Sequence, residues 1–230
     1  MSDSFICSPP PAISLAIHDS DRRFPVHRIY CIGRNYEAHA KEMQATVNLE
    51  APVFFCKPAD ALVQGNGTVP YPSATTDLHH EVELVAALGC GGRDLTPAQG
   101  LATVIAYGVG LDLTRRDLQA QAKAKGTPWD TAKGFDHSAP ISELALVADI
   151  GHPVSGQLRL EVNGSVRQQV DIADMLLKVG ETLSALSRFY ELRAGDLLFT
   201  GTPAGVAAMQ RGDHFRASFP GIPDLSGSIV

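Results

Sequence analysis

The amino-acid sequence predicts an α+β protein built mainly on a mixed β-sheet with short flanking helices. Short apolar segments recur along the 230-residue chain, and 21 glycines and 15 prolines separate them, which is typical of strands joined by turns. The expected helices do not alternate regularly with the expected strands, so a regular βαβ fold is not indicated. Asn163 and Gly164, at the centre of an alternating segment over 158–170, predict a β-hairpin.

The first half of the chain predicts an N-terminal segment followed by three strands. Residues 1–26 contain PPPA and HDSDRRFP and are expected to form an arm or a small edge hairpin, which leaves 27–230 as the main domain. The elements expected next are a strand over 28–33, a short helix over 35–43 with Asn35 as a candidate N-cap, a strand over 52–58, a turn over 64–72 and a strand over 80–89.

The second half predicts two helical stretches among further strands. The expected elements are a strand over 103–113, a helix over 113–126 closed by Gly126, an irregular segment over 127–142, the hairpin over 158–170, a helical stretch over 172–192 interrupted at Gly180, a strand within 194–206 that runs into a Gly-rich loop, and a last strand within 211–221.

Composition excludes several classes of function. The net charge is −6 and no block of like charge occurs, which argues against nucleic acid as a partner. No apolar run reaches the ~18–20 residues that span a bilayer, and no basic region precedes an apolar stretch at the N-terminus, so neither a membrane nor a secretion signal is indicated. Four cysteines without a C-x-x-C pair indicate free thiols in the cytoplasm.

Glu81 and Glu83 are the most informative residues because they precede and enter an apolar strand segment. Residues i and i+2 of a strand point to the same face, so both carboxylates are directed to one place in or near the core. Asp112 ends the expected strand over 103–113 and adds a third carboxylate. Oxygen ligands of this kind suit Mg²⁺ or Mn²⁺. The alternatives are a solvated strand face for the glutamates and a helix cap near Thr114 for Asp112.

Other polar residues suggest further chemistry or a different metal. His79 and His80 offer nitrogen ligands for zinc, although strand phase places only His79 on the face of the glutamates. His39 and Glu42 are three residues apart on the expected helix, so they form either a base with its orienting carboxylate or an ordinary exposed pair. Lys133, in a Pro-flanked loop, either stabilises an oxyanion or faces solvent.

Several residues are candidates for binding an anionic substrate. Thr200, Gly201 and Thr202 follow a strand and can offer backbone N–H groups and hydroxyls to a carboxylate or phosphate. The basic and amide side chains with the same potential are Arg34, Lys57, Arg115, Arg116 and Gln119, although Arg115 and Arg116 can equally be surface charges.

Six segments, in this order, resemble the fumarylacetoacetate hydrolase family, and the likeness is greatest to its fumarylpyruvate and acylpyruvate hydrolase branch. The segments are IGRNYEAHAKEM, FFCKP, DLHHEVELVAALG, GLDLTRRDLQ, AKGFDHSAPIS and LLFTGTPAGV, which together cover most of residues 28–206. The sequence departs from the branch at Cys56, and His137 follows Asp136 in the lysine loop.

The resemblance implies a strand-rich mixed-sheet roll with flanking helices, found as a homodimer, with a catalytic domain over 27–230. It implies Mg²⁺ or Mn²⁺ held by Glu81, Glu83 and Asp112. It further implies a water-activating pair, His39 and Glu42, on a lid helix. The remaining implied groups are the active-site lysine Lys133 and substrate-carboxylate contacts near Thr202.

The expected function is hydrolysis of a C–C bond in an acylpyruvate, a 2,4-diketo acid. Fumarylpyruvate, which yields fumarate and pyruvate in aromatic catabolism through gentisate, is the expected substrate. Its second carboxylate requires a further cationic or hydroxyl group, for which Arg34 and Arg116 are candidates. The alternatives are oxaloacetate decarboxylation, isomerisation or hydration of a related keto acid, and a non-enzymatic module that binds dicarboxylates.

Overall fold

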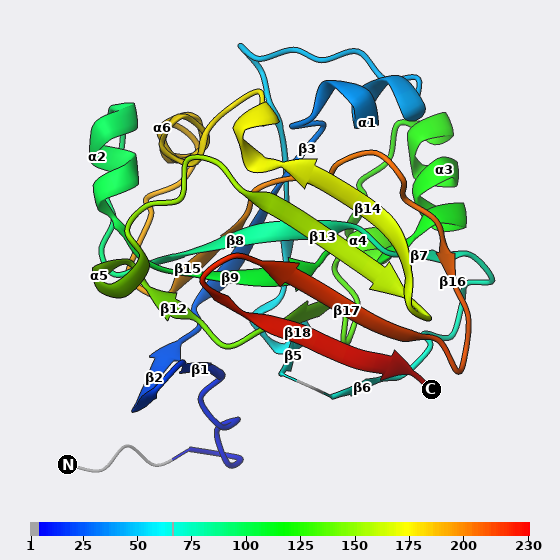
Figure 1. Ribbon diagram of the computed structural model, residues 1–230, viewed down its shortest axis with the longest axis horizontal. Coiled ribbons are helices and arrows are strands. Elements are labelled where there is room, and N and C mark those ends of the chain that lie inside the picture. The colour runs from blue at the N-terminus through cyan, green and yellow to red at the C-terminus, as the bar shows by residue number, and fades with distance from the viewer. Residues whose placement is uncertain (1–4, 66) are drawn as a thin grey trace.

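The computed structural model describes residues 5–65 and 67–230, so residues 1–4 of the expected arm and Asn66 of the expected turn lie outside the described residues. Its centre is an eight-stranded mixed sheet (Figure 1). The strand order is β4-β3-β15-β8-β9-β11-β5, and β12 pairs with β9 beside β11. These strands are β3 (Arg28–Gly33), β4 (Val53–Lys57), β5 (Leu62–Gln64), β8 (Val82–Leu88), β9 (Val104–Leu111), β11 (Ala139–Ile141), β12 (Ala145–Leu146) and β15 (Asp196–Phe199).

A second sheet of five strands packs over one face of the first (Figure 1). Its order is β14-β13-β17-β18-β6, and β13, β17 and β18 contact the central strands β8 and β9. The strands are β6 (Thr68–Val69), β13 (Gln157–Val162), β14 (Ser165–Asp171), β17 (His214–Phe219) and β18 (Ile222–Ile229). The fold is therefore α+β, as the sequence predicts.

Strand β8 is buried on both faces, because each face contributes to a different hydrophobic core. Val82 and Leu84 point into the core between the two sheets. Val85 points into a second core on the opposite face, together with Leu15 and Phe24. These last two residues belong to the N-terminal hairpin of β1 (Ser14–Ile17) and β2 (Ser20–Pro25), which packs against the central sheet. Glu83 lies two residues before Val85, so it shares the second face.

Short helices and a small third sheet surround this framework. The helices are α1 (Glu37–Glu42), α2 (Pro97–Ala102), α3 (Arg116–Lys125), α4 (Asp130–Lys133), α5 (Val147–Ile150), α6 (Val179–Ser187) and the 3₁₀ turns η1 (Ala59–Ala61) and η2 (Ile172–Asp174). The third sheet has the order β10-β7-β16, with β7 (Leu78–His79), β10 (Thr114–Arg115) and β16 (Ala208–Met209). None of the helices that the structure describes has the length and apolar character needed to cross a membrane.

Two local predictions are confirmed by backbone geometry. The hairpin joins β13 to β14 through Asn163 and Gly164, whose φ angles of 52° and 74° lie in the left-handed region that such two-residue turns require. Helix α3 ends at Gly126, which has a φ of 66°.

Other local predictions are wrong. The N-cap of α1 is Tyr36, and the Asn35 side chain instead bridges two other segments. Gly180 does not interrupt a helix: α6 begins only at Val179, and Gly180 lets α6 approach α2, since a Cβ there would lie 2.5 Å from the carbonyl oxygen of Pro97. The segment over 127–142, expected to be irregular, contains α4 and β11.

Candidate metal centre and active site

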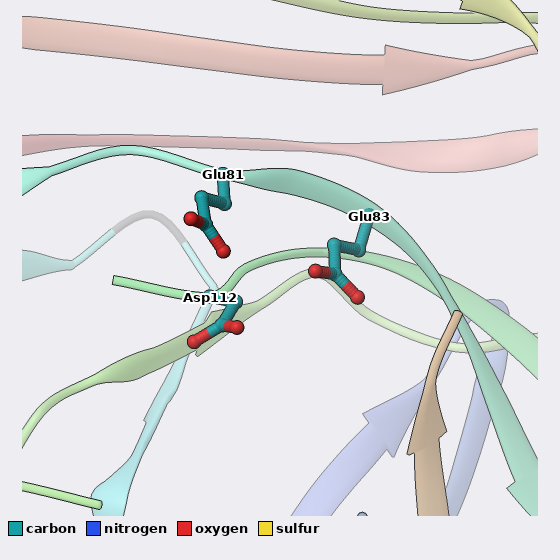
Figure 2. Close-up of side chains that lie close together, drawn as sticks. All are labelled: Glu81, Glu83 and Asp112. Atoms are coloured by element: carbon teal, nitrogen blue, oxygen red, sulfur yellow. The ribbon is translucent and has the colours of Figure 1, made fainter. Parts of the chain in front are cut away.

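Strand register brings the three acidic residues together. Val82 pairs with Leu111 and Glu83 with Gly110 in the antiparallel ladder of β8 and β9. Glu81 and Asp112 extend this ladder, since the Asp112 N–H donates to the Glu81 carbonyl at 2.8 Å. Their side chains converge with that of Glu83 (Figure 2), and one carboxylate oxygen from each lies within 4.8 Å of the others. The solvated face is therefore excluded, because all three residues are buried. The helix cap at Asp112 is excluded because the N-cap of α3 is Arg115, and no side chain caps that helix.

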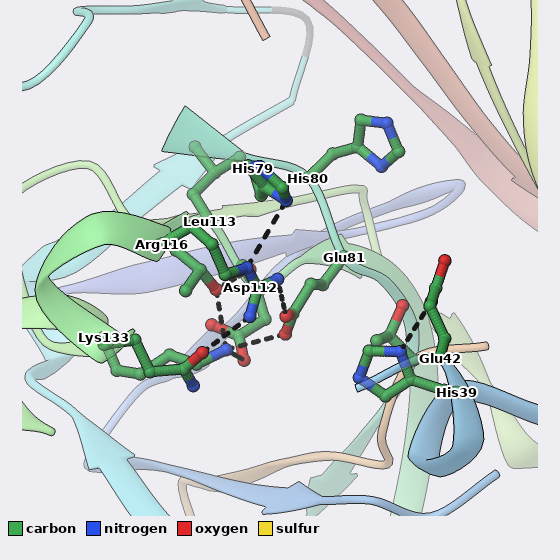
Figure 3. A network of polar contacts seen from close by, with 12 residues as sticks. His39, Glu42, His79, His80, Glu81, Asp112, Leu113, Arg116 and Lys133 are labelled. Atoms are coloured by element: carbon green, nitrogen blue, oxygen red, sulfur yellow. Dashed lines mark hydrogen bonds and ion pairs between the residues drawn. The ribbon is translucent and has the colours of Figure 1, made fainter. Parts of the chain in front are cut away.

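Two buried lysines hold Asp112 in place. The Lys133 ammonium donates to Asp112 Oδ2 at 2.6 Å, to Glu81 Oε2 at 2.6 Å and to Thr114 Oγ1 at 2.7 Å (Figure 3). The Lys57 ammonium lies 2.8 Å from Asp112 Oδ1 and donates to the Leu113 carbonyl at 3.1 Å. Burial alone would lower the pKa of Lys133, but Asp112 and Glu81 outweigh it and raise that pKa.

Arg116 completes the cationic side of the cluster. Its guanidinium pairs with Glu81 and donates to Gln119 Oε1 at 2.6 Å. Burial would raise the pKa of Glu81, but Lys133 and then Arg116 overcome this and hold the pKa well below its usual range. Glu81 is therefore a carboxylate with both oxygens engaged by cations.

Glu83 differs from its two neighbours because no basic side chain among the described residues pairs with it. Its Oε2 accepts the Gly201 N–H at 2.6 Å. Gly201 has a φ of 94°, and a Cβ there would lie 2.7 Å from Cβ of Asn35, so this position requires glycine. Burial, and then the negative charges of Asp112 and Glu81, raise the pKa of Glu83 well above its usual range.

The donor set fits a hard divalent cation. Cationic side chains pair with Glu81 and Asp112, whereas no basic side chain of the described residues pairs with Glu83. Asp112 Oδ1 also has no hydrogen bond of normal geometry, although Lys57 lies nearby. An oxygen-only site of this kind suits Mg²⁺ or Mn²⁺. The carboxylate cluster therefore suits the predicted divalent ion, and the assignment of these three residues as its ligands stays a prediction.

The zinc alternative is not supported within the ranges 5–65 and 67–230. The group of metal-ligating side chains found there contains Glu81, Glu83 and Asp112 and no histidine. His79 Nε2 bonds Asp77 at 2.9 Å, and His79 Nδ1 accepts from Arg116 at 3.4 Å. His80 Nδ1 instead contacts Gln168 at 2.9 Å. His79 therefore orients the arginine that holds Glu81.

His39 and Glu42 form the expected pair on α1. Their Nδ1 and Oε2 atoms are 3.2 Å apart (Figure 3), and the His39 side chain is only 8% exposed. The Gly205 N–H donates to both oxygens of Glu42, at 3.1 and 3.2 Å. This contact ties the short helix to the loop that follows β15.

Asn35 fixes the start of this region. Its side-chain amide donates to the carbonyls of Leu177 and Thr200, at 2.9 and 2.8 Å, and its Oδ1 accepts the Leu177 N–H at 2.8 Å. Arg34, immediately before it, has a left-handed φ of 63° and donates to the Thr46 carbonyl at 3.1 Å. The chain therefore turns sharply between β3 and α1, which directs α1 over the carboxylates.

A cleft lies between α1, α3 and the carboxylates. Most of the predicted site residues line it, namely Arg34, His39, Glu81, Glu83, Asp112, Arg116, Gln119, Lys133 and Thr202. Lys57 and Glu42 do not line it: Lys57 lies behind Asp112, and Glu42 contacts His39 from the side. Arg115 also lies away from the cleft, with its guanidinium 4.3 Å from the centre of the Phe135 ring.

Sequence reasoning missed several residues of the site. Lys123, Trp129, Phe55 and Met43 also line the cleft. Gln168 on β14 donates to Thr202 Oγ1 at 2.9 Å and accepts the Val82 N–H at 3.0 Å, so it positions both sides of the site. Helical spacing could have identified Lys123, which shares a face with Arg116 and Gln119, but no local pattern marks Gln168.

The fold and the site define a class of protein in which buried carboxylates beside a His–Glu pair form a metal-binding enzyme site. The family model described as "Fumarylacetoacetate (FAA) hydrolase C-terminal" matches residues 28–230. The chain therefore belongs to the fumarylacetoacetate hydrolase family, as the resemblance in the sequence indicates.

Particular relatives carry two different activities in their names. The crystal structure of fumarylpyruvate hydrolase from Pseudomonas aeruginosa, in complex with Mn²⁺ and pyruvate, is 48% identical with a TM-score of 0.96 and 99% of each chain covered. A putative fumarylpyruvate hydrolase from Burkholderia cenocepacia is 47% identical with a TM-score of 0.92, covering 100% of this chain and 96% of that one. Oxaloacetate tautomerase YcgM from Escherichia coli is 42% identical, covering 86% of this chain and 90% of its own.

Proposed function

We propose that the protein hydrolyses the C3–C4 bond of an acylpyruvate, which joins the methylene carbon between the two keto groups to the 4-keto carbon. Fumarylpyruvate is thereby converted to fumarate and pyruvate. The observation that carries this proposal is the His39–Glu42 pair beside the carboxylate cluster, which provides a base next to a metal-binding site. The similarity to a fumarylpyruvate hydrolase over 99% of both chains supports it.

Glu81, Glu83 and Asp112 are the proposed ligands of one Mg²⁺ or Mn²⁺ ion. When bound, such an ion supplies Lewis-acid stabilisation of negative charge on the keto-acid end of a substrate. Lys57 and Lys133 pair with Asp112 and orient its carboxylate for this role.

His39 is the proposed general base. If the Glu42 carboxylate accepts the proton on Nδ1 at 3.2 Å, Nε2 is left unprotonated and able to accept a proton from water. The Gly205 N–H holds Glu42 in this orientation. The hydroxide then adds to the 4-carbonyl carbon of the substrate.

The remaining steps are cleavage of the C–C bond and return of the proton from His39. The C3–C4 bond breaks, its electron pair passes to the pyruvate portion, and His39 returns its proton to C3 as the methyl group of pyruvate forms. Lys133 is the proposed donor to the oxyanion and would exchange one of its present hydrogen bonds for this contact. Gln119 can donate a second hydrogen bond to the oxyanion. Its Nε2 has no partner among the described residues, while its Oε1 accepts a hydrogen bond from Arg116.

Keto–enol tautomerisation of oxaloacetate is the second candidate, which the 42% identity to oxaloacetate tautomerase YcgM favours. His39 could then move a proton between carbon and oxygen of a related keto acid without addition of water. Both candidates use the same base and differ in whether a C–C bond breaks.

One experiment separates the two candidates. The protein, with Mn²⁺ and after chelation, is given fumarylpyruvate or oxaloacetate, and NMR follows the products. We expect fumarate and pyruvate in equal amounts from fumarylpyruvate, only with metal. Accelerated enol–keto exchange of oxaloacetate without fumarylpyruvate cleavage would overturn the proposal in favour of the tautomerase, and pyruvate from oxaloacetate would indicate decarboxylation.

The proposal also includes a homodimer in the cytoplasm. Edge strand β4 lies beside Phe189 and Tyr190, which are 63% and 38% exposed, and this face offers an apolar surface to a second copy. The four cysteines form no disulfide in the described chain, which suits a reducing compartment. Sedimentation equilibrium tests the dimer, and a monomer at micromolar concentration would contradict it.

A further inference from the structure

The basic residues of the cleft fall into two groups. Lys57, Lys133 and Arg116 are all engaged by Glu81 or Asp112, so they compensate charges that the protein itself carries. Lys123 and Arg34 also line the cleft, yet neither pairs with a carboxylate anywhere in the described chain. The cleft therefore contains two positive charges that no carboxylate of residues 5–65 and 67–230 pairs with.

Lys123 is held at the cleft by an aromatic ring. Its ammonium lies 5.3 Å from the centre of the Trp129 ring, which also lines the cleft. Partial burial, and then repulsion from Arg116 and Arg34, lower the pKa of Lys123, so these three cations are close enough to influence one another. An anion placed among them would relieve this repulsion.

Helix α3 separates Arg116 of the first group from Lys123 of the second. Arg116, Gln119 and Lys123 share one face of the helix, and Arg116 pairs with Glu81 at its first turn. Lys123 lies seven residues further along, about 10 Å down the helix axis. Arg116 therefore lies at the carboxylate end of the cleft, and Lys123 lies two helical turns away from that end.

We propose that Lys123, together with Arg34, binds the distal carboxylate of the substrate and makes the enzyme selective for dicarboxylates over monocarboxylates. This inference rests on the proposed function, since it assumes that the keto-acid end of the substrate lies at the carboxylate cluster. Of the two residues that the sequence offers for the second carboxylate, Arg34 and Arg116, the structure favours Arg34, because Arg116 is already paired. It adds Lys123 as the principal specificity residue.

The test compares two substrates that differ only at the distal end: fumarylpyruvate, and crotonylpyruvate, in which a methyl group replaces the distal carboxylate. In Lys123→Met we expect kcat/KM for fumarylpyruvate to fall about 10-fold, as for loss of one hydrogen bond to a charged group. The value for crotonylpyruvate should change less than about 2-fold. Lys123→Arg, which keeps the charge, should retain most of the preference for fumarylpyruvate.

Lys125→Met is the matched control, because it removes the same charge from the same helix at a position that does not line the cleft. It should leave both substrates unaffected. An equal loss for both substrates in Lys123→Met, or no loss for either, would overturn the inference. If the wild type hydrolyses neither compound, the proposed function fails. The binding of the same two compounds, measured by calorimetry, then decides the role of Lys123. The inference requires that Lys123→Met weakens the binding of fumarylpyruvate, the dianion, and leaves the binding of crotonylpyruvate unchanged.

Discussion

The two sides of the cleft are built in different ways. The carboxylate side lies on β8 and β9, and β8 has hydrogen-bonded neighbours on both edges and buried side chains on both faces. The base side lies on α1, a helix of six residues without a side-chain N-cap. Glu42 is held there by one backbone N–H, that of Gly205, and its side chain is 34% exposed.

From this difference we predict that the proposed metal binding and the proposed proton transfer are separable. The three carboxylates are fixed by strand register, which cannot shift by one residue without moving a whole hydrophobic face out of the core. The base is fixed by a few polar contacts on a short helix, so it can be displaced without disturbing the carboxylate cluster. Three variants test this separation, in order of decreasing expected effect.

Glu83→Gln should disable the carboxylate side. Loss of a ligand should abolish measurable Mn²⁺ binding and lower turnover by about 10⁴-fold, equivalent to several kcal/mol of lost charge stabilisation. Calorimetric titration with Mn²⁺ and steady-state kinetics provide the measurement. Retention of near-normal Mn²⁺ affinity would exclude Glu83 as a ligand.

The same variant should change how stability depends on pH when metal has been removed by chelation. Burial and the neighbouring acids raise the pKa of Glu83 above its usual 4.5, so the folded wild type loses stability as pH rises from about 4.5 through the raised value. Glu83→Gln lacks this loss. Its free energy of unfolding, from urea denaturation, should therefore exceed that of the wild type at neutral pH, and the excess should vanish at acid pH. An excess that is constant with pH would contradict the raised pKa of Glu83.

His39→Ala should disable only the base side. Turnover should fall by about 10³-fold, within the range of 10²–10⁴ for general-base catalysis, while the Mn²⁺ affinity stays within about 2-fold of the wild type. Kinetics and calorimetry on the same preparation give both values. Normal turnover would remove His39 from the mechanism, and a large loss of metal affinity would show that the two sides are coupled.

Gly205→Ala should weaken the base side indirectly. Gly205 has a φ of 95°, and a Cβ there would collide with the Arg167 carbonyl oxygen, so the N–H that holds Glu42 must move. We expect turnover to fall roughly 10- to 100-fold with unchanged Mn²⁺ affinity. Gly212→Ala is the control, because Gly212 has a similar φ of 91° but open space at the Cβ position. An equal loss of activity in both variants would point to general backbone strain.

The sequence predicted the carboxylate side better than the base side for a physical reason. The two-residue period of a strand places Glu81 and Glu83 on one face, and an acid at the end of a buried strand marks Asp112, so local rules identified all three as candidates. The family resemblance, and not the local pattern, favoured metal ligands over a solvated face or a helix cap. The hairpin at Asn163 was also predictable from a local rule. In contrast, Asn35 has the composition of a helix cap, but its role as a bridge to Leu177 and Thr200 depends on contacts distant in the sequence.

Long-range contacts also explain what was missed elsewhere. Strand β18 contains Pro223 and Gly227 and has weak intrinsic strand character, and its conformation depends on pairing with β17 and β6. Lys133 lies in a segment that local composition assigns to solvent, but the converging charges of Glu81 and Asp112 bury it. Tertiary electrostatics of this kind leave no periodic signal in the chain.

The most direct test of the central claim is anomalous diffraction from crystals soaked in Mn²⁺. The claim is that Glu81, Glu83 and Asp112 together hold one divalent ion beside the His39–Glu42 pair. We predict a single manganese peak bounded by one oxygen from each of the three carboxylates. A manganese peak at His79 and His80, or no peak between the carboxylates at saturating Mn²⁺, would contradict the account.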